Sequence, residues 1–369
     1  MMMSSISETQ QQEDNKGIMF DSQYQWVSLS PMNEKRDGCA AVALSDTEIL
    51  VVGGHDGNTC LNSVLRYDIS TDLWENLPYR MNEGRIGSAV ARVDNKIYVV
   101  GGAQGPRDFA TVEVLDLDDS PRQWRLIMGS TMHVGRYGCA AVAVDPFIYV
   151  IGGANSGGCL NSVEILDTRT ETWSPGPPMT TKRDGCAAAV VGKFVMVVGG
   201  NNGILSLSTA EQLDVSQSNQ RWILLNQPMK STRMFPAAIN VRDELVVIGG
   251  LKGSGALDSA ESWKDSVWTT ISAKLLPRFR CAAVMLGTDL VVVGGHALSS
   301  VECLMSPYRL FQHRLSHIKW WSLLDDDLPV ALWPHILSRL GQKHWESEMF
   351  HLNKEWMVHY LVELKNRSL

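Results

Sequence analysis

Six arginines recur along the chain at nearly equal intervals, and they are the residues best suited to bind an anion. Each one begins a phrase of small residues, such as "RDGCAAVAL" or "RYGCAAVAV", and successive copies lie 45 to 51 residues apart. A guanidinium group can hold a carboxylate through two parallel hydrogen bonds. The alternative is that each arginine pairs with a nearby carboxylate of its own chain and is structural. The six residues are Arg36, Arg85, Arg136, Arg183, Arg233 and Arg278.

Seven cysteines form a second set of reactive groups. Four of them stand three residues after a repeat arginine, and we interpret them as small buried residues in a reducing compartment. The sequence has no C-x-x-C pair, phosphate-binding loop or G-x-S-x-G motif. It therefore indicates no metal site, no cofactor and no catalytic residue.

Double glycines and short apolar segments recur with the same period as the arginines. Each Gly-Gly ends a β-branched segment such as "EILVVGG" or "KIYVVGG", 16 or 17 residues after the arginine. A segment of the type "SVEILD" follows, and then a tryptophan such as Trp173. We therefore expect each repeat to form short strands separated by turns, with small residues on the first strand and a tryptophan on the fourth.

These repeats resemble the kelch repeat in its R-x-G, Gly-Gly, V-E-x-Y-D and W-x-x-L-x-P-M parts, over residues 24–307. The resemblance implies an all-β fold: a six-bladed β-propeller with one four-stranded blade per repeat. In kelch substrate receptors, arginines at the R-x-G position help to capture acidic peptides. The resemblance therefore implies that the six arginines form a ring near one mouth of the central channel and bind a partner there.

The N-terminal segment supplies the strand that the last repeat lacks. The sixth repeat has no tryptophan segment of its own, and the missing piece stands at residues 25–32 as "QWVSLSPM". We therefore expect residues 25–30 to complete blade six, which closes the ring and removes two exposed sheet edges. The polar residues 1–19 are expected to form a disordered leader.

The loops after each Gly-Gly should point to the same face as the arginines. They differ in sequence and length between repeats, as recognition loops on a rigid scaffold do. For any single loop residue, the alternative is a polar side chain that is merely solvated. The loop residues expected to contact a partner are His55, Asp56, Asn155, Asn201, Asn202 and His296.

Residues 308–369 have a different pattern, which predicts a small α-helical extension. Within it, "LPVALWPHILSRL" followed by "HLNKEW" resembles an F-box. That resemblance implies binding to a ubiquitin-ligase adaptor; the alternative is a helical hairpin that packs on the propeller or on a second copy of it. The residues that would contact the adaptor are Leu328, Pro329, Ile336, Leu337, Leu340 and Trp356.

The net charge of −7 disfavours nucleic acid and acidic membranes as partners. No apolar segment approaches the ~20 residues that cross a bilayer, and no secretory signal is visible, so we expect a cytoplasmic or nuclear protein. The sequence favours a non-enzymatic module that recognises a protein or acidic peptide on one propeller face. With the F-box resemblance, it would be a substrate receptor of a ubiquitin ligase. The alternatives are a sugar-acting kelch-type enzyme and a filament-binding scaffold.

Overall fold

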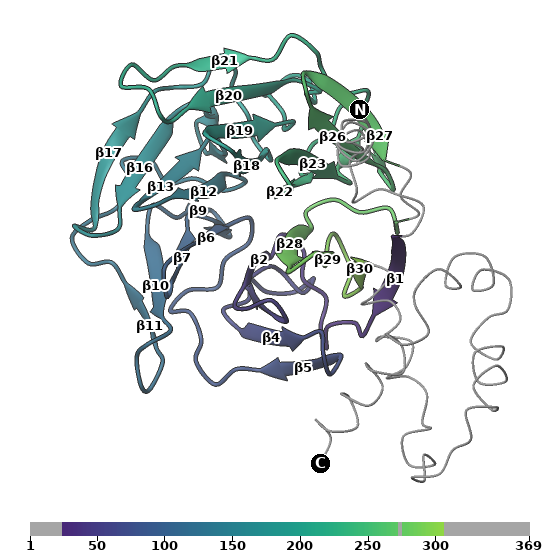
Figure 1. Cartoon of the computed structure of the whole chain (residues 1–369). Coiled ribbons are helices and arrows are strands. Elements are labelled where there is room, and N and C mark those ends of the chain that lie inside the picture. Colours follow the sequence, from purple (N-terminus) through teal and green to yellow (C-terminus); the bar gives the residue numbers. More distant parts are fainter. Residues whose placement is uncertain (1–23, 272–274, 306–369) are drawn as a thin grey trace, which may run out of the picture. The chain divides into compact units, whose positions relative to one another are not determined.

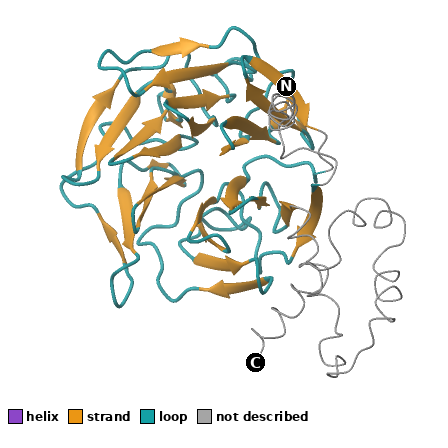
Figure 2. Ribbon diagram, viewed as in Figure 1, coloured by secondary structure: helices purple, strands orange, loops and turns teal. Residues whose placement is uncertain are grey.

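Six four-stranded antiparallel sheets surround a common axis and form a β-propeller (Figures 1 and 2). The computed structural model describes residues 24–271 and 275–305. This confirms the expected all-β, six-bladed fold. No helix in these two ranges could span a membrane. The predicted leader and the helical extension at residues 308–369, with its F-box-like residues, lie outside the described residues.

Blades one to five each take their four strands from one continuous stretch of chain. Blade one contains β2 (Ala40–Ala43), β3 (Glu48–Val52), β4 (Val64–Asp68) and β5 (Leu73–Asn76). Blade two contains β6 (Ala89–Val93), β7 (Lys96–Val100), β10 (Val112–Asp116) and β11 (Trp124–Leu126). Blade three contains β12 (Ala140–Val144), β13 (Phe147–Ile151), β16 (Val163–Asp167) and β17 (Thr172–Gly176). Blade four contains β18 (Ala187–Val191), β19 (Phe194–Val198), β20 (Ala210–Asp214) and β21 (Trp222–Leu224). Blade five contains β22 (Ala237–Val241), β23 (Glu244–Ile248), β26 (Ala260–Lys264) and β27 (Val267–Ile271).

Blade six is closed by the N-terminal strand, as the sequence predicted. It contains β28 (Ala282–Leu286), β29 (Asp289–Val293), β30 (Val301–Met305) and, at its outer edge, β1 (Gln25–Leu29). β1 is antiparallel to β30, with Trp26 opposite Leu304. The two ends of the propeller are therefore hydrogen-bonded in one sheet.

The first strand of each blade lies at the axis, where it contacts the first strands of both neighbouring blades. Alanine-rich segments such as β18 fit this crowded position because their side chains are small. The second strands are almost completely buried on both faces, which explains their continuous β-branched sequences.

The repeat tryptophans connect neighbouring blades. The indole Nε1 of Trp222 in blade four donates to the carbonyl oxygen of Pro177 in blade three at 2.9 Å, and Trp268 of blade five donates to Gln227 in blade four at 3.0 Å. Both rings are buried. The tryptophans thus fill the space between the wide outer parts of adjacent blades, as expected.

Each Gly-Gly pair approaches the backbone of the next blade. Gly102, with φ of 91°, donates its N–H to the carbonyl oxygen of Arg136 at 2.8 Å, and a Cβ on Gly101 would lie only 2.5 Å from that oxygen. Equivalent bonds follow around the ring, and Gly295 donates to Arg36 at 3.4 Å to complete the circle. The glycines are therefore needed both for their backbone conformation and for close approach.

Three short two-stranded ribbons follow the Gly-Gly pairs of blades two, three and five. They are β8 (Ala103–Gln104) with β9 (Arg107–Asp108), β14 (Ala154–Asn155) with β15 (Gly158–Cys159), and β24 (Leu251–Lys252) with β25 (Gly255–Ala256).

Candidate binding site at the mouth of the channel

The six repeat arginines lie inside the blades, and each is only 0–1% exposed. In blade four, Nη1 of Arg183 donates to the carbonyl oxygens of Gly199 and Thr209, both at 2.9 Å. The corresponding bonds are present in the other blades. Each arginine therefore joins the start of the first strand to the second and third strands of its own blade.

A glutamate on the third strand neutralises the arginine in five of the six blades. The Nη2 to carboxylate distances are 2.5–3.0 Å. The partners are Glu113, Glu164, Glu211, Glu261 and Glu302. Blade one has Leu65 at this position, and Arg36 pairs instead with Glu34 at 2.5 Å. Burial lowers the pKa of Arg36, Arg85 and Arg233, while the adjacent carboxylates raise it.

The arginines therefore do not form the exposed ring that the sequence suggested. Their donors are occupied by backbone carbonyls and carboxylates of the same blade, and their side chains have almost no exposed surface. The other interpretation raised from the sequence, structural pairing with nearby carboxylates, describes their contacts in this structure.

The residues two positions after the arginines form a closed ring of backbone hydrogen bonds around the axis. Gly138, for example, donates its N–H to the carbonyl oxygen of Gly87 at 2.8 Å, and the six N···O distances are 2.7–3.2 Å. All six residues have φ between 58° and 65° except Phe235, at 53°. The ring consists of Gly38, Gly87, Gly138, Gly185, Phe235 and Arg280.

Phe235 and Arg280 are the two members of this ring that carry side chains. Both adopt a left-handed conformation that costs an ordinary residue roughly 1–2 kcal/mol. The guanidinium carbon of Arg280 lies 4.5 Å from the centroid of the Phe235 ring, in a cation–π contact. Blades five and six therefore place large side chains at ring positions where the other four blades have only a glycine hydrogen.

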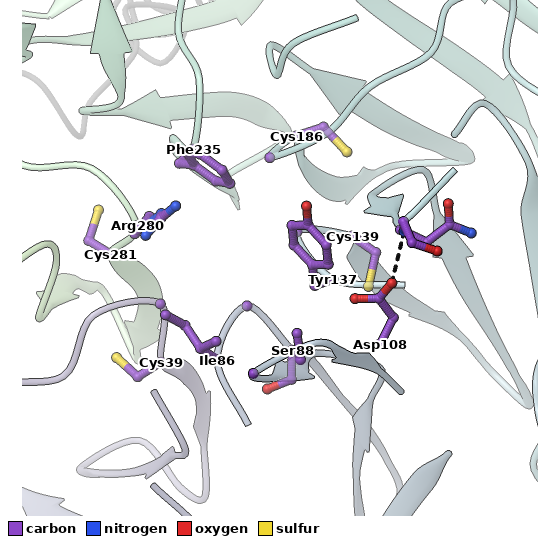
Figure 3. Close-up of a pocket in the computed structure, with 18 of the residues that line it drawn as sticks. Cys39, Ile86, Ser88, Asp108, Tyr137, Cys139, Cys186, Phe235, Arg280 and Cys281 are labelled. Atoms are coloured by element: carbon purple, nitrogen blue, oxygen red, sulfur yellow. Dashed lines mark hydrogen bonds between the residues drawn. The ribbon is translucent and has the colours of Figure 1, made fainter. Parts of the chain in front are cut away.

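A cavity of about 570 Å³ opens at this ring (Figure 3). Figure 3 shows Ile86, Tyr137, Phe235 and Arg280 around a common opening, each from a different blade. The loops after the Gly-Gly pairs contribute polar groups to the rim. Among them, Asp108 accepts a hydrogen bond from the backbone N–H of Ser156 at 2.9 Å.

The charged groups around the cavity are mainly acidic. Nη1 of Arg280 lies 3.2 Å from Oδ2 of Asp37, and Nδ1 of His296 lies 3.1 Å from the same oxygen. Burial raises the pKa of Asp184 to about 6, and the charge of Arg280 acts in the opposite direction. Burial also raises the pKa of Tyr137, with further contributions from Asp184 and Asp108.

The loop residues named from the sequence lie on the same side as this ring. The residue after an arginine pairs with the residue after Gly-Gly in the same blade, as in Asp37 with His55 and Asp184 with Asn201. Asn155 lines the cavity.

Four of these loop residues use their side-chain oxygens within their own loops. They accept backbone N–H groups two or three residues ahead, and they are Asp56, Asn155, Asn201 and Asn202. Those bonds lower the pKa of Asp56.

The repeat pattern does not reveal the side chains that give the cavity its character. They are Ile86, Tyr137, Phe235 and Arg280 in its lining, and Asp184 beside it. The available signal was the departure from the R-x-G pattern, because "RMF" and "RFR" replace its glycine with Phe235 and Arg280. The departures thus mark the cavity better than the repeated arginine does.

Four cysteines line the wall of the cavity at equivalent positions of the first strands. They are buried, as expected, and burial raises their pKa to about 11 or 12. These residues are Cys39, Cys139, Cys186 and Cys281. Cys60 and Cys159 are only half-buried, because they lie in the rim loops. No disulfide joins the seven cysteines, all of which lie within the described residues.

The six repeats, their Gly-Gly contacts and the interblade tryptophans define a kelch-type propeller. Residues 38–250 match the KLHDC2/KLHL20/DRC7 kelch-repeats domain, and the chain belongs to this family.

Similar proteins include Kelch repeat and BTB domain-containing protein 12 of Danio rerio, with 29% identity over 43% of this chain and 28% of that protein. Kelch-like protein 35 of Mus musculus is 33% identical over 36% of this chain and 22% of its own length. Kelch repeat and BTB domain-containing protein 2 of cowpox virus (strain Brighton Red) is 31% identical over 31% of this chain and 20% of its own. The chain thus spans 20–28% of the length of these relatives.

Proposed function

We propose that this chain is a protein-interaction module that binds a segment of a partner protein at the mouth of its channel. The observation that carries the proposal is the pair Phe235 and Arg280. Both hold a left-handed backbone conformation at ring positions where four blades have glycine. Strained residues of this kind are retained mainly where the strain is useful, and they cluster at binding sites.

The cavity has the size and composition of a site for one or two side chains. Its volume of about 570 Å³ lies within the range of ligand pockets, and its wall combines aromatic and aliphatic groups with a few polar ones. The surrounding loops are connected directly to rigid strands, which suits recognition of a defined partner. The expectation of an acidic peptide depends on exposed arginines. Since these arginines are buried and paired, the proposal does not include that requirement.

Affinity capture tests this proposal. The full-length chain is compared with a variant carrying Phe235→Gly and Arg280→Gly, which restores the residue found in the other four blades and should not disturb the fold. We expect partners of the native chain to be lost with this variant. They should be retained with Asp46→Arg, which changes an exposed residue in the turn between β2 and β3, at the opposite end of the channel. Capture of the same partners by the native chain and by the variant with Phe235→Gly and Arg280→Gly would overturn the proposal.

We also propose that residues 308–369 tether the propeller to a larger assembly, such as a ubiquitin ligase for which it would be the substrate receptor. The basis is the F-box-like sequence, together with relatives whose names combine kelch repeats with a BTB domain. Capture with the full-length chain and with residues 1–307 tests this role. A ligase adaptor should be recovered only with the full-length chain, and recovery with both would contradict the tethering role.

A further inference from the structure

Three carboxylates and one guanidinium lie close to the cavity, which bears on the kind of partner it accepts. Arg280 forms an ion pair with Asp37 at 3.2 Å. The charge of Arg280 also acts on Asp184, and the charges of Asp184 and Asp108 act on Tyr137 in the cavity wall. Arg107, on the blade two loop, is already paired with Glu83 at 2.6 Å. A partner carboxylate that entered here would therefore meet three carboxylates around one occupied guanidinium.

Asp184 has an unsatisfied oxygen beside the cavity. Its Oδ1 is buried and has no hydrogen-bond partner among the described residues. This oxygen lies next to Gly138 of the ring, since a Cβ built on that glycine would come within 2.4 Å of it. A buried carboxylate oxygen without a donor is costly, and a cationic donor from a partner would satisfy it.

Blade four also carries an unusual loop at the same mouth. Ile204 and Leu205 are 85% and 65% exposed at the tip of the loop that follows its Gly-Gly. Their backbone N–H groups both donate to Oδ1 of Asn202 at 2.9 Å, so the tip has a defined conformation. In the described range, no other Gly-Gly loop presents a large aliphatic side chain that is this exposed.

The two features are adjacent because one ladder connects them. Asp184 and Asn201 exchange backbone hydrogen bonds of 2.8 and 2.7 Å. The exposed aliphatic pair therefore begins three residues after the partner of Asp184. Two exposed aliphatic side chains on a loop at the same mouth as the cavity are typical of a protein-binding surface.

We propose that the mouth recognises a partner segment by a lysine or arginine side chain that enters the cavity beside Asp184, with a neighbouring apolar side chain packed on Ile204 and Leu205. This inference rests on the proposed function and specifies its ligand. The face of Tyr137 provides a further favourable contact for a cation.

The raised pKa of Asp184 agrees with an unfilled cation site. The titratable groups that influence it or are influenced by it are Arg280, Tyr137, Cys139, Cys159 and Cys186. A bound cation would lower this pKa, so binding should release protons when the pH is near 6.

The probe for this inference is a phage-displayed library of random peptides of about twelve residues, selected on the immobilised full-length chain. We expect enrichment of peptides that place an apolar residue next to a lysine or arginine. One enriched peptide and its copy with glutamine at the basic position are then synthesised with a fluorophore, and their affinities are measured by anisotropy. The native chain should prefer the basic peptide by about tenfold.

Three variants assign this preference to the residues named. Asp184→Asn should reduce the preference for the basic peptide to about onefold, whereas Asp46→Asn, a matched charge change at the opposite end of the channel, should leave it unchanged. Ile204→Ser with Leu205→Ser should weaken both peptides about tenfold and leave the preference intact. Circular dichroism confirms that each variant is folded.

The possible failures are distinguishable. If enriched peptides are acidic or neutral but still need Phe235 and Arg280, the inference about the ligand is wrong and the proposed function stands. If Asp184→Asn leaves the basic preference unchanged, the assignment to Asp184 is wrong. If no peptide binds the native chain better than the variant with Phe235→Gly and Arg280→Gly, both proposals fail.

Discussion

Arg183 and Glu211 form an ion pair in which Nη2 of the arginine lies 3.0 Å from Oε1 of the glutamate, and neither side chain has exposed surface. The other carboxylate oxygen accepts the backbone N–H of Thr180 at 2.7 Å. One glutamate therefore connects β20 both to the arginine and to the segment that enters blade four. This relationship explains the recurrence of the arginine: each blade uses it to join its strands at the mouth.

Removing one partner of this pair should be strongly destabilising. Glu211→Gln leaves the buried guanidinium without its counter-charge, and we expect a loss of about 3–5 kcal/mol in the free energy of unfolding, measured with urea. The matched control is Glu34→Gln in blade one, where the glutamate is 34% exposed and water can replace it, so about 1 kcal/mol is expected. Equal losses in the two variants would show that burial does not decide the importance of these pairs.

The N-terminal strand should be essential for the closed ring. Deleting residues 1–32 removes β1 and exposes the edge of β30, with loss of the packing of Trp26. We expect the thermal midpoint to fall by about 10 °C, because several kcal/mol of buried contacts are lost. A chain that lacks only residues 1–23 keeps β1 and serves as the control. Similar midpoints for the two deletions would refute closure by this strand.

Alanine substitutions at two glycines of blade two should distinguish the cost of backbone strain from the cost of a steric clash. Both have left-handed φ, 65° for Gly101 and 58° for Gly105, but only Gly101 would bring a Cβ within 2.5 Å of a carbonyl oxygen, that of Arg136. Gly105→Ala should therefore cost about 1 kcal/mol and Gly101→Ala more than about 3 kcal/mol. Urea unfolding of the two variants measures the difference, and comparable losses would mean that the interblade contact at Gly101 is not tight.

The repeat could be read from the sequence because its physical demands are local. The Gly-Gly pairs, the alanines of the first strands and the tryptophans each occupy positions that tolerate few residue types. The N-terminal segment around Trp26 matches the one strand that the sixth repeat lacks. The role of the repeat arginines could not be predicted from the sequence. Their spacing shows that an arginine such as Arg183 stands at the start of each first strand, but it does not show where the guanidinium group points. That direction depends on Glu211, which is distant in sequence and looks like an ordinary strand residue.

The character of the binding cavity could not be read from the repeat pattern at all. It depends on two positions that break the pattern, Phe235 and Arg280, and on the unsatisfied oxygen of Asp184. A pattern search gives weight to what recurs, whereas an asymmetric partner is recognised by what differs between blades. The exposed pair Ile204 and Leu205 belongs to the same class of signal.

Asp184 should make the stability of the propeller depend on pH. Burial raises its pKa from 3.8 to about 6, so the folded chain binds this proton more tightly than the unfolded chain does. The contribution of this group to stability is complete below pH ~4 and is lost as the pH rises through about 6. At neutral pH the ionised carboxylate therefore destabilises the folded state, a cost that a binding residue can impose.

Asp184→Asn removes this titration and should raise the free energy of unfolding by about 1–2 kcal/mol at neutral pH. Below pH ~3 the gain should disappear, because the carboxyl is then largely protonated in both the folded and the unfolded state. Urea unfolding of the native chain and the variant across this range measures the difference, in which the effects of other carboxylates cancel. Asp46→Asn, at an exposed position, should give a difference that does not change with pH. A constant difference for Asp184→Asn as well would mean that Asp184 is ionised throughout, and that its surroundings do not disfavour the charge.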